Sequence, residues 1–170
     1  NLILKKKKII FSKCLIVIDN KIPKKFIKLI IKNFKGRKFY TLSFNANEKN
    51  KNYLSINKIH NALFNKNFYR DDCVISFGGG ITGDVVGYAA STFKRGIKFI
   101  NIPSTLLAQV DSSIGGKTGI NNKFGKNLVG SFYQPDLVIS DINLLNSLPK
   151  REIICGYAEI LKSSLIDSKT

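Results

Sequence analysis

Short runs of apolar residues alternate along this chain with longer segments in which apolar residues recur at the spacing of a helix. The short runs have the length of buried strands, and strands that alternate with helices are typical of βαβ units around a parallel sheet. The alternation therefore predicts an α/β fold with a mainly parallel sheet, an architecture that commonly binds nucleotides. The predicted strands are residues 14–18, 38–44, 72–77, 97–102 and 137–140, and the predicted helices are residues 23–34, 53–64, 81–94 and 151–166.

Length and composition narrow the class of protein. A chain of 170 residues is long enough for one globular domain with its own core. Its apolar runs are broken by Lys, Asn or Gly well before the ~20 residues that a membrane span needs, which predicts no membrane segment. The cysteines stand singly at Cys14, Cys73 and Cys155, which is a poor disulfide framework, so we expect a reducing, cytoplasmic environment.

The formal charge of +17 would suit a nucleic-acid-binding protein, because Lys and Arg supply most of the non-specific affinity for phosphate backbones. The charge is spread along the chain apart from residues 5–8, and the composition is rich in Ile, Lys, Asn and Phe together, as an AT-biased coding sequence yields. We therefore expect the charge to affect solubility and the steering of anions, and we expect no nucleic-acid partner.

Three glycines, Gly78, Gly79 and Gly80, lie directly between a predicted buried strand and a predicted helix. Glycines in this position let the backbone approach a pyrophosphate, whose charge is favoured by the free N–H groups of the helix N-terminus. The three glycines do not form a G-x-G-x-x-G motif, so they could equally well serve only as a tight turn between the strand and the helix. Asp84 would bind a ribose or nicotinamide group in the first case and favour the helix dipole in the second.

A dense cluster of polar residues and glycines follows the fourth predicted strand, at residues 103–121, and continues at residues 125–127. It combines hydroxyl groups, a carboxylate, a glycine pair and cations, which are suitable partners for a small anionic polyol. Residues 103–130 are therefore predicted to be a functional loop region. The stretch at residues 115–118 is not a P-loop, because the first glycine of that motif would fall at Asp111.

From Gly78 to Lys162 the sequence closely resembles the 3-dehydroquinate synthase family, whose members are sugar phosphate cyclases. The part before Gly78 matches more loosely. The segments that carry the resemblance are Gly78-Gly79-Gly80 with Asp84, Lys94-Arg95-Gly96, residues 103–121, Gly125-Lys126-Asn127, Phe132-Tyr133-Gln134-Pro135, Asp141, Leu148-Pro149, Arg151-Glu152 and residues 156–162.

The resemblance implies a site for NAD. Ser104 and Ser147 stand where the family more often has threonine, and Ser104 keeps the hydroxyl group. Lys117 and Lys126 are also expected near this cofactor. The positions that match NAD-binding residues of the family are Asp19, Glu48, Lys51, Gly79, Gly80, Asp84, Ser104, Thr105, Leu107, Leu148 and Glu152.

The resemblance also implies a substrate site and a divalent metal, zinc or cobalt. Arg95 matches an arginine that reaches the substrate phosphate of a neighbouring subunit, so a homodimer is implied for a full-length protein. Glu159 matches a metal-ligating carboxylate, although by spacing alone Glu159 and Lys162 would be a surface ion pair. The positions that match substrate-contacting residues are Asp111, Lys117, Lys126, Asn127 and Lys162.

Members of the family convert 3-deoxy-arabino-heptulosonate 7-phosphate into 3-dehydroquinate and phosphate in the shikimate pathway, which leads to aromatic amino acids. The resemblance implies this function, with residues 1–149 as an NAD-binding domain and residues 150–170 as the start of a truncated helical domain for metal and substrate. The two histidine ligands of the family would lie beyond Thr170, and His60 is expected on a helix surface, so we expect this chain alone to be inactive.

The alternatives are another sugar phosphate cyclase, such as 2-deoxy-scyllo-inosose synthase, and a non-catalytic remnant that binds a nucleotide. Iron-dependent alcohol and glycerol dehydrogenases share the architecture, but Lys117, Lys126-Asn127 and Glu159-x-x-Lys162 favour a cyclase.

Overall fold

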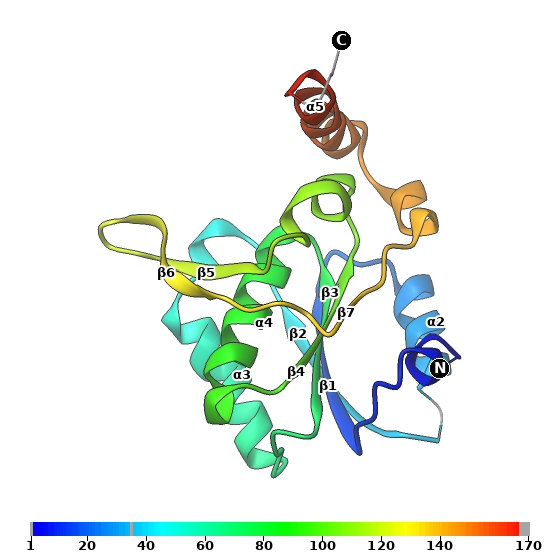
Figure 1. Ribbon diagram of the computed structural model, residues 1–170, viewed down its shortest axis with the longest axis vertical. Helices are drawn as coiled ribbons and strands as arrows, with labels where there is room; N and C mark the ends of the chain where they lie inside the picture. The colour runs from blue at the N-terminus through cyan, green and yellow to red at the C-terminus, as the bar shows by residue number, and fades with distance from the viewer. Residues whose placement is uncertain (1, 35, 167–170) are drawn as a thin grey trace.

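The computed structural model describes residues 2–34 and 36–166. A parallel five-stranded sheet forms its centre, in the order β2-β1-β3-β4-β7, as Figure 1 shows. The predicted α/β fold with a parallel sheet is therefore confirmed. The strands of the sheet are β1 (Lys13–Asp19), β2 (Lys38–Phe44), β3 (Cys73–Gly78), β4 (Lys98–Pro103) and β7 (Leu137–Val138).

Helices cover both faces of the sheet, with α3 and α4 on one side and α2 on the other (Figure 1). The inner strands are consequently apolar on both faces. Leu15 and Val17 of β1 join the core under α3 and α4, whereas Cys14 and Ile16 join the core under α2. The α-helices are α1 (Leu2–Lys6), α2 (Lys24–Asn33), α3 (Tyr53–Asn65), α4 (Gly80–Thr92) and α5 (Lys150–Ile166), and the short turns are η1 (Glu48–Asn50), η2 (Phe93–Arg95), η3 (Ala108–Ser112) and η4 (Ile142–Ser147).

The loop prediction for residues 103–130 is wrong over much of its length. β5 (Lys117–Asn122) and β6 (Gly125–Phe132) form an antiparallel hairpin that packs on α4. The side chain of Asn122 closes the turn, because its Oδ1 accepts hydrogen bonds from the backbone N–H groups of Phe124 (2.9 Å) and Gly125 (3.1 Å). Ile120 is the one large apolar side chain of this hairpin that is fully buried among the described residues, so a strand pattern is hard to recognise there.

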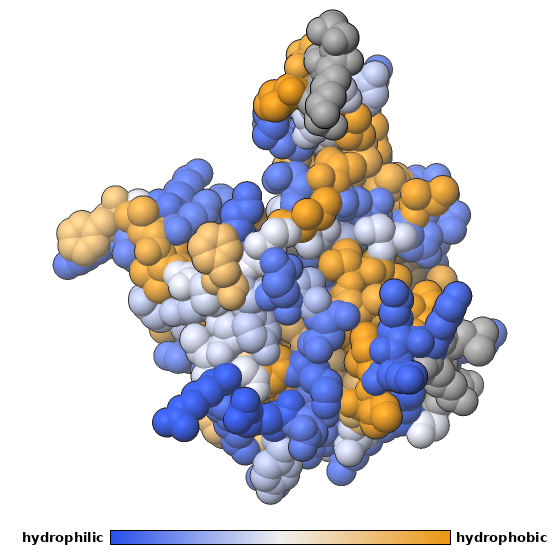
Figure 2. Space-filling view, viewed as in Figure 1, coloured by the Kyte–Doolittle hydropathy of each residue, from blue (hydrophilic) through white to orange (hydrophobic). Residues whose placement is uncertain are grey.

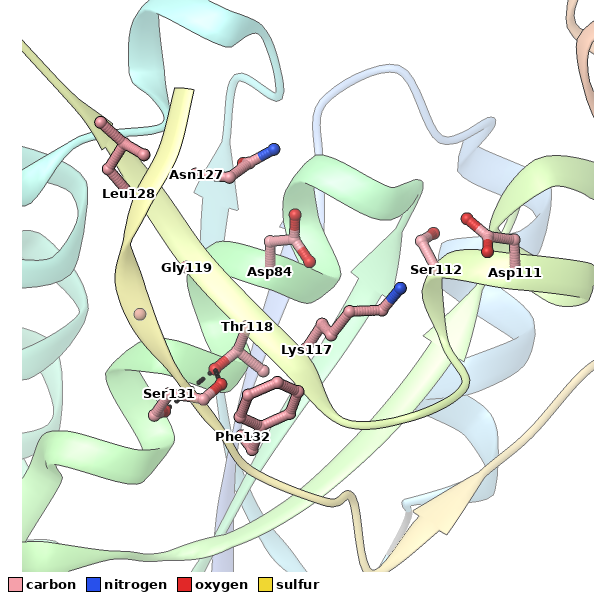
Figure 3. Close-up of a pocket in the computed structure, with 11 residues that line it drawn as sticks. Asp84, Asp111, Ser112, Lys117, Thr118, Gly119, Asn127, Leu128, Ser131 and Phe132 are labelled. Carbon is pink, nitrogen blue, oxygen red and sulfur yellow. Dashed lines mark hydrogen bonds between the residues drawn. The ribbon is translucent and has the colours of Figure 1, made fainter. Parts of the chain in front are cut away.

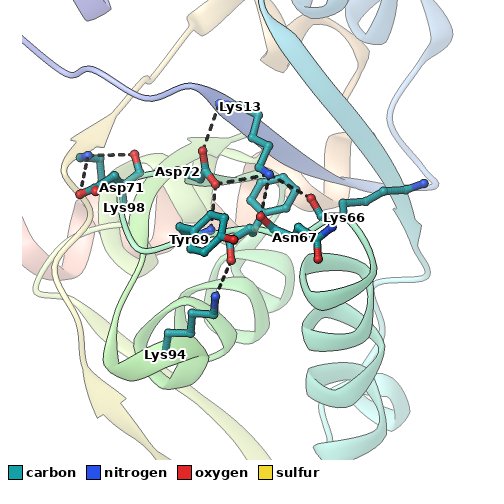
Figure 4. A network of polar contacts seen from close by, with 9 residues as sticks. Lys13, Lys66, Asn67, Tyr69, Asp71, Asp72, Lys94 and Lys98 are labelled. Atoms are coloured by element: carbon teal, nitrogen blue, oxygen red, sulfur yellow. Dashed lines mark hydrogen bonds and ion pairs between the residues drawn. The ribbon is translucent and has the colours of Figure 1, made fainter.

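A polar network fixes the amino end of the sheet (Figure 4). Asp72 is only 4% exposed, and its carboxylate accepts hydrogen bonds from the backbone N–H groups of Lys13 (3.3 Å) and Tyr69 (2.8 Å). The ammonium group of Lys13 in turn donates to the carbonyl groups of Lys66 (2.9 Å) and Asn67 (2.7 Å). These contacts join the start of β1 to the connection between α3 and β3, because every partner lies on one of these segments.

The last helix, α5, projects from the body of the molecule (Figure 1). It touches the body at Gly156, where a Cβ atom would lie 2.5 Å from Cγ of Leu106. The division into residues 1–149 and 150–170 stays a prediction, and positions 1, 35 and 167–170 lie outside the described residues. Within residues 2–34 and 36–166, no helix combines the length and the apolar character that crossing a bilayer requires.

The hairpin sits closely on α4 because Gly87 has no side chain. A Cβ atom at Gly87 would lie 2.5 Å from Cγ2 of Thr118 on β5 and 3.1 Å from the ring of Phe99 on β4. The atoms of Thr118 and Phe99 are packed and have little room to move. Any side chain at position 87 must therefore push the hairpin away from α4.

We expect Gly87→Ala to lower the free energy of unfolding by about 1–3 kcal/mol, which is typical of overpacking. Urea titration followed by circular dichroism measures the change. Thr118→Ser removes the methyl group that would clash with the new Cβ atom at position 87 and keeps the hydroxyl group that is bonded to Ser131. The double variant Gly87→Ala/Thr118→Ser should therefore recover part of the lost free energy of unfolding. Equal stabilities of the single and double variants would contradict this account of the helix–hairpin contact.

Candidate functional site

The carboxyl ends of β1, β3 and β4 meet at one edge of the sheet, where Asp19, Gly78 and Pro103 end the three strands. The chain passes from β1 to β2 on one side and from β3 to β4 on the other, so the crevice between β1 and β3 is a topological switch point. A Cβ atom at Gly78 would lie 2.4 Å from Oγ1 of Thr82 and 3.0 Å from Cβ of Asp19. Only glycine therefore fits at the end of β3.

The two glycines that follow β3, Gly79 and Gly80, leave their backbone uncovered by side chains of their own and form what we call the glycine cradle. Gly79 precedes α4 without a side-chain cap, which leaves N–H groups at the start of the helix free for an anion. A Cβ atom at Gly79 would lie 3.2 Å from Cγ2 of Thr105, and one at Gly80 would lie 2.7 Å from Oγ of Ser112. Glycine at both positions therefore lets the segment that carries Thr105 and Ser112 lie close to the start of α4.

A pocket of about 690 Å³ extends from this cradle. It brings together residues of several loops that are far apart in the sequence, from the end of β1 to the start of α5. Their roles in binding stay predictions, but all the positions matched to NAD-binding residues except Lys117 and Lys126 line this one pocket. They are Asp19, Glu48, Lys51, Gly79, Gly80, Asp84, Ser104, Thr105, Leu107, Leu148 and Glu152.

A second pocket of about 580 Å³ lies beside the first, between α4, η3 and the hairpin (Figure 3). Asp84 and Ser112 line both pockets, so the two adjoin at these residues. In Figure 3 the amino group of Lys117 points toward Ser112 and Asp111. Of the predicted substrate residues, Asp111, Lys117 and Asn127 line this pocket.

A buried cation links the two pockets. The ammonium group of Lys51, which is 4% exposed, forms an ion pair with Asp84 and donates a hydrogen bond to Oδ1 of Asn127. Burial raises the pKa of Asp84, and the hydrogen bond from Lys51 opposes that shift. Burial likewise raises the pKa of Asp19, whose carboxylate accepts the backbone N–H of Lys21 at 3.0 Å.

Sequence reasoning did not single out Ser112. Its Oγ, with Oγ1 of Thr82 and Oγ of Ser113, is buried without a hydrogen-bond partner within the described part of the chain. Such groups are costly unless a ligand or water satisfies them. In the sequence, Ser112 lies between Asp111 and the glycine pair of the polar cluster. This position was the one feature of the sequence that could have marked Ser112 as a site residue.

Arg95 lies away from these pockets, at the amino end of β4. Arg95 and Lys94 both have positive φ values, 67° and 49°. The ammonium group of Lys94 donates to the carbonyl of Phe68 at 2.9 Å and holds this turn in place (Figure 4). Arg95 instead lines an open polar depression together with Arg70 and Lys98. Its side chain is therefore not among those that line the two pockets described above.

Lys126 is exposed on β6, and Glu159 and Lys162 form an ion pair on α5. The hydrogen bond that the ammonium group of Lys162 donates to the carboxylate of Glu159 raises the pKa of Lys162. None of these three residues is among those that line the two pockets. The spacing i and i+3 alone predicts the ion pair, and a metal-binding role for Glu159 stays a prediction.

The described residues contain no group of three or more His, Cys, Asp or Glu side chains that could hold a metal ion. His60 is half-buried between α3 and α4 rather than on the helix surface. Its Nε2 lies 2.9 Å from the carbonyl oxygen of Ala89, and its ring packs near Phe93. His60 therefore has a packing role.

The fold and the two pockets define the class of protein: an α/β domain of the Rossmann-like type, with its pockets at the carboxyl edge of a parallel sheet. The family model for the N-terminal domain of 3-dehydroquinate synthase matches residues 41–155. The chain belongs to this family.

Known proteins show the same likeness. A 3-dehydroquinate synthase of Pelagibacter ubique is 63% identical over 169 residues, which are 99% of this chain and 46% of that protein. The structure of a 2-deoxy-scyllo-inosose synthase complexed with carbaglucose-6-phosphate, NAD+ and Co2+ is 30% identical with a TM-score of 0.84, over 89% of this chain and 42% of that one.

The 2-epi-5-epi-valiolone synthase of Streptomyces hygroscopicus, with NAD+ and Zn2+ bound, is 31% identical with a TM-score of 0.84, over 89% of this chain and 43% of that one. The chain therefore spans about half the length of the relatives it matches.

The role of Lys51 can be tested through the pKa of Asp84. Lys51→Met removes the cation and leaves a buried carboxyl group, so we expect the pKa of Asp84 to rise above its value in the unchanged protein. A group whose pKa is raised by folding stabilises the fold below its unfolded pKa and loses that contribution as the pH rises through the folded value. The variant should therefore lose stability toward neutral pH.

Carbon-13 NMR of the Asp84 carboxyl group measures the titration directly. Lys51→Arg keeps a cation and serves as the matched control. An Asp84 pKa that is unchanged in Lys51→Met would rule out this ion pair.

Proposed function

We propose that this chain is the NAD-binding half of a 3-dehydroquinate synthase, which converts 3-deoxy-arabino-heptulosonate 7-phosphate into 3-dehydroquinate and phosphate. One observation carries the proposal: residues from five separate segments, each matched to the family for NAD binding, converge on one pocket. The identity of the chain to curated synthases supports the same substrate rather than that of another cyclase.

The larger pocket suits NAD in shape and chemistry. The cradle at Gly79 and Gly80 would take the pyrophosphate, since it offers N–H groups and no Cβ atoms. Asp84, which lines both pockets, would bind the ribose or nicotinamide end, near the hydroxyl group of Ser112, for which residues 2–34 and 36–166 provide no hydrogen-bond partner. When bound, NAD would supply a hydride acceptor and donor, and Asp84 and Ser112 would hold its ribose or nicotinamide end.

The smaller pocket suits a small anionic polyol. The ammonium group of Lys117 would bind a phosphate or carboxylate group, and the oxygens of Asp111 would accept hydrogen bonds from hydroxyl groups. Asn127 would offer the N–H donors of its amide group, since its Oδ1 already accepts a hydrogen bond from Lys51. Because the pocket meets the NAD pocket at Asp84, a hydroxyl-bearing carbon bound there would lie beside the nicotinamide.

A divalent metal does not fit the described residues by themselves, because Glu159 stands on α5 with Lys162 as its partner. We propose that α5 belongs to a second helical unit that completes the site. The support is the exposure of its large apolar side chains, which Figure 2 shows at the projecting end of the molecule. These side chains are Ile154, Tyr157, Leu161, Leu165 and Ile166. Arg95 would act on a substrate held by a second subunit, since it faces away from this chain's pockets.

Binding of NAD tests the proposal directly. Gly79→Val fills the cradle, so we expect the dissociation constant for NAD to rise at least about tenfold, which corresponds to about 1.4 kcal/mol. Gly125→Val makes the same change outside both pockets and should bind NAD as the unchanged protein does. Isothermal titration calorimetry measures both, and equal affinities of the two variants would contradict the assignment of the pocket.

We further expect the 170-residue chain alone to show negligible synthase turnover, because the residues proposed for metal and substrate on α5 lie apart from the two pockets. Release of inorganic phosphate from the substrate, in the presence of NAD and zinc or cobalt, measures this. Turnover that depends on the metal would refute the expectation.

A further inference from the structure

Asn121, near the end of β5, connects three segments of the chain. Its backbone N–H donates to the carbonyl of Lys51 at 2.8 Å. Its side-chain Nδ2 donates to Oε2 of Glu48 at 2.8 Å, and its Oδ1 accepts the backbone N–H of Asn127 at 2.9 Å. One residue thus joins the segment around η1, which lines the larger pocket, to β6, which lines the smaller one.

The contact needs an amide side chain. An asparagine offers a donor and an acceptor at the same time, whereas an aspartate accepts only and an alanine does neither. The donor meets the carboxylate of Glu48, so this hydrogen bond is charge-assisted and stronger than one between neutral groups. Replacement of Asn121 would therefore break at least one of the two links.

The backbone of Asn127 turns sharply. Its φ of 58° lies in the left-handed region, which asparagine adopts more readily than most other residues that carry a side chain. Asn121 supports it from the backbone side, and Lys51 supports it through the side-chain oxygen. The direction of the Asn127 side chain into the smaller pocket depends on both contacts.

These bonds form a closed ring. From the segment that carries Glu48 and Lys51, one link runs through Asn121 and the other runs directly from the Lys51 ammonium group, and both end at Asn127. Lys51 also pairs with Asp84, which lines both pockets. A ligand that orders Glu48 and Lys51 would therefore also order Asn127.

We propose that Asn121 is a positioning residue that couples the two pockets, so that NAD bound against Glu48 and Lys51 orders the β5–β6 hairpin before the sugar phosphate arrives. The inference rests on the proposed function, since it takes NAD as the ligand of the larger pocket. Asn121 itself lines neither of the two pockets, so it acts through Glu48 and Asn127.

Hydrogen exchange of the hairpin amides, measured by mass spectrometry with and without NAD, tests the coupling. In the unchanged protein NAD should slow exchange over residues 117–132 severalfold. Asn121→Ala should lose this protection while the amides of the central sheet stay protected. Asn122→Ala is the matched control, because the Asn122 side chain caps the hairpin turn instead and the protection by NAD should persist.

Asn121→Asp separates the two links. It keeps the acceptor for Asn127, but it places a carboxylate 2.8 Å from that of Glu48. We expect the affinity for NAD to fall about tenfold at low salt and to recover partly at high salt, because salt screens the repulsion between exposed charges.

Two outcomes would overturn the inference: the same protection of the hairpin by NAD in Asn121→Ala as in the unchanged protein, or an affinity of Asn121→Asp that does not respond to salt. Failure of the unchanged protein to bind NAD would overturn the proposed function itself, and calorimetry distinguishes that result from the other two.

Discussion

The buried ion pair between Lys51 and Asp84 is the contact on which the arrangement of the two pockets depends. Lys51 follows η1, Asp84 lies in α4, and the same ammonium group reaches Asn127 on β6. A buried charge must be paired or hydrogen-bonded, so these three segments have to meet whenever the chain is folded. The pair therefore holds the hairpin, which lines the smaller pocket, beside the larger pocket, and it also provides a partner for a lysine that is only 4% exposed.

Small residues complete this geometry by letting elements approach closely. Gly78 accommodates the side chains of Asp19 and Thr82 at the end of β3, and Gly87 accommodates Thr118 under the hairpin. In a parallel sheet both faces are covered, so the space for a ligand has to come from such positions at the strand ends. The opposite end of the sheet, by contrast, is closed by the hydrogen bonds of Asp72.

The sheet could be predicted from sequence because strands such as β3 are continuous apolar runs that end in glycine. The hairpin could not, because its inward positions hold Thr118, Ile120, Val129 and Ser131, which are polar at both ends and give only a short apolar alternation. The resemblance to the family named the residues of the larger pocket. It did not reveal Asn121 or Ser112, because their roles follow from hydrogen-bond partners, or the lack of one, which only the folded chain defines.

The turn that carries Arg95 has one further consequence. Lys94, Arg95 and Gly96 all have positive φ, and Lys94 ties the turn to the carbonyl of Phe68. A turn fixed in this way has little conformational freedom left to lose, so an anion that meets Arg95 would bind without a large entropic cost of ordering the backbone. The strain is already present in the folded chain, and the guanidinium group is thereby presented to the outside on a rigid support.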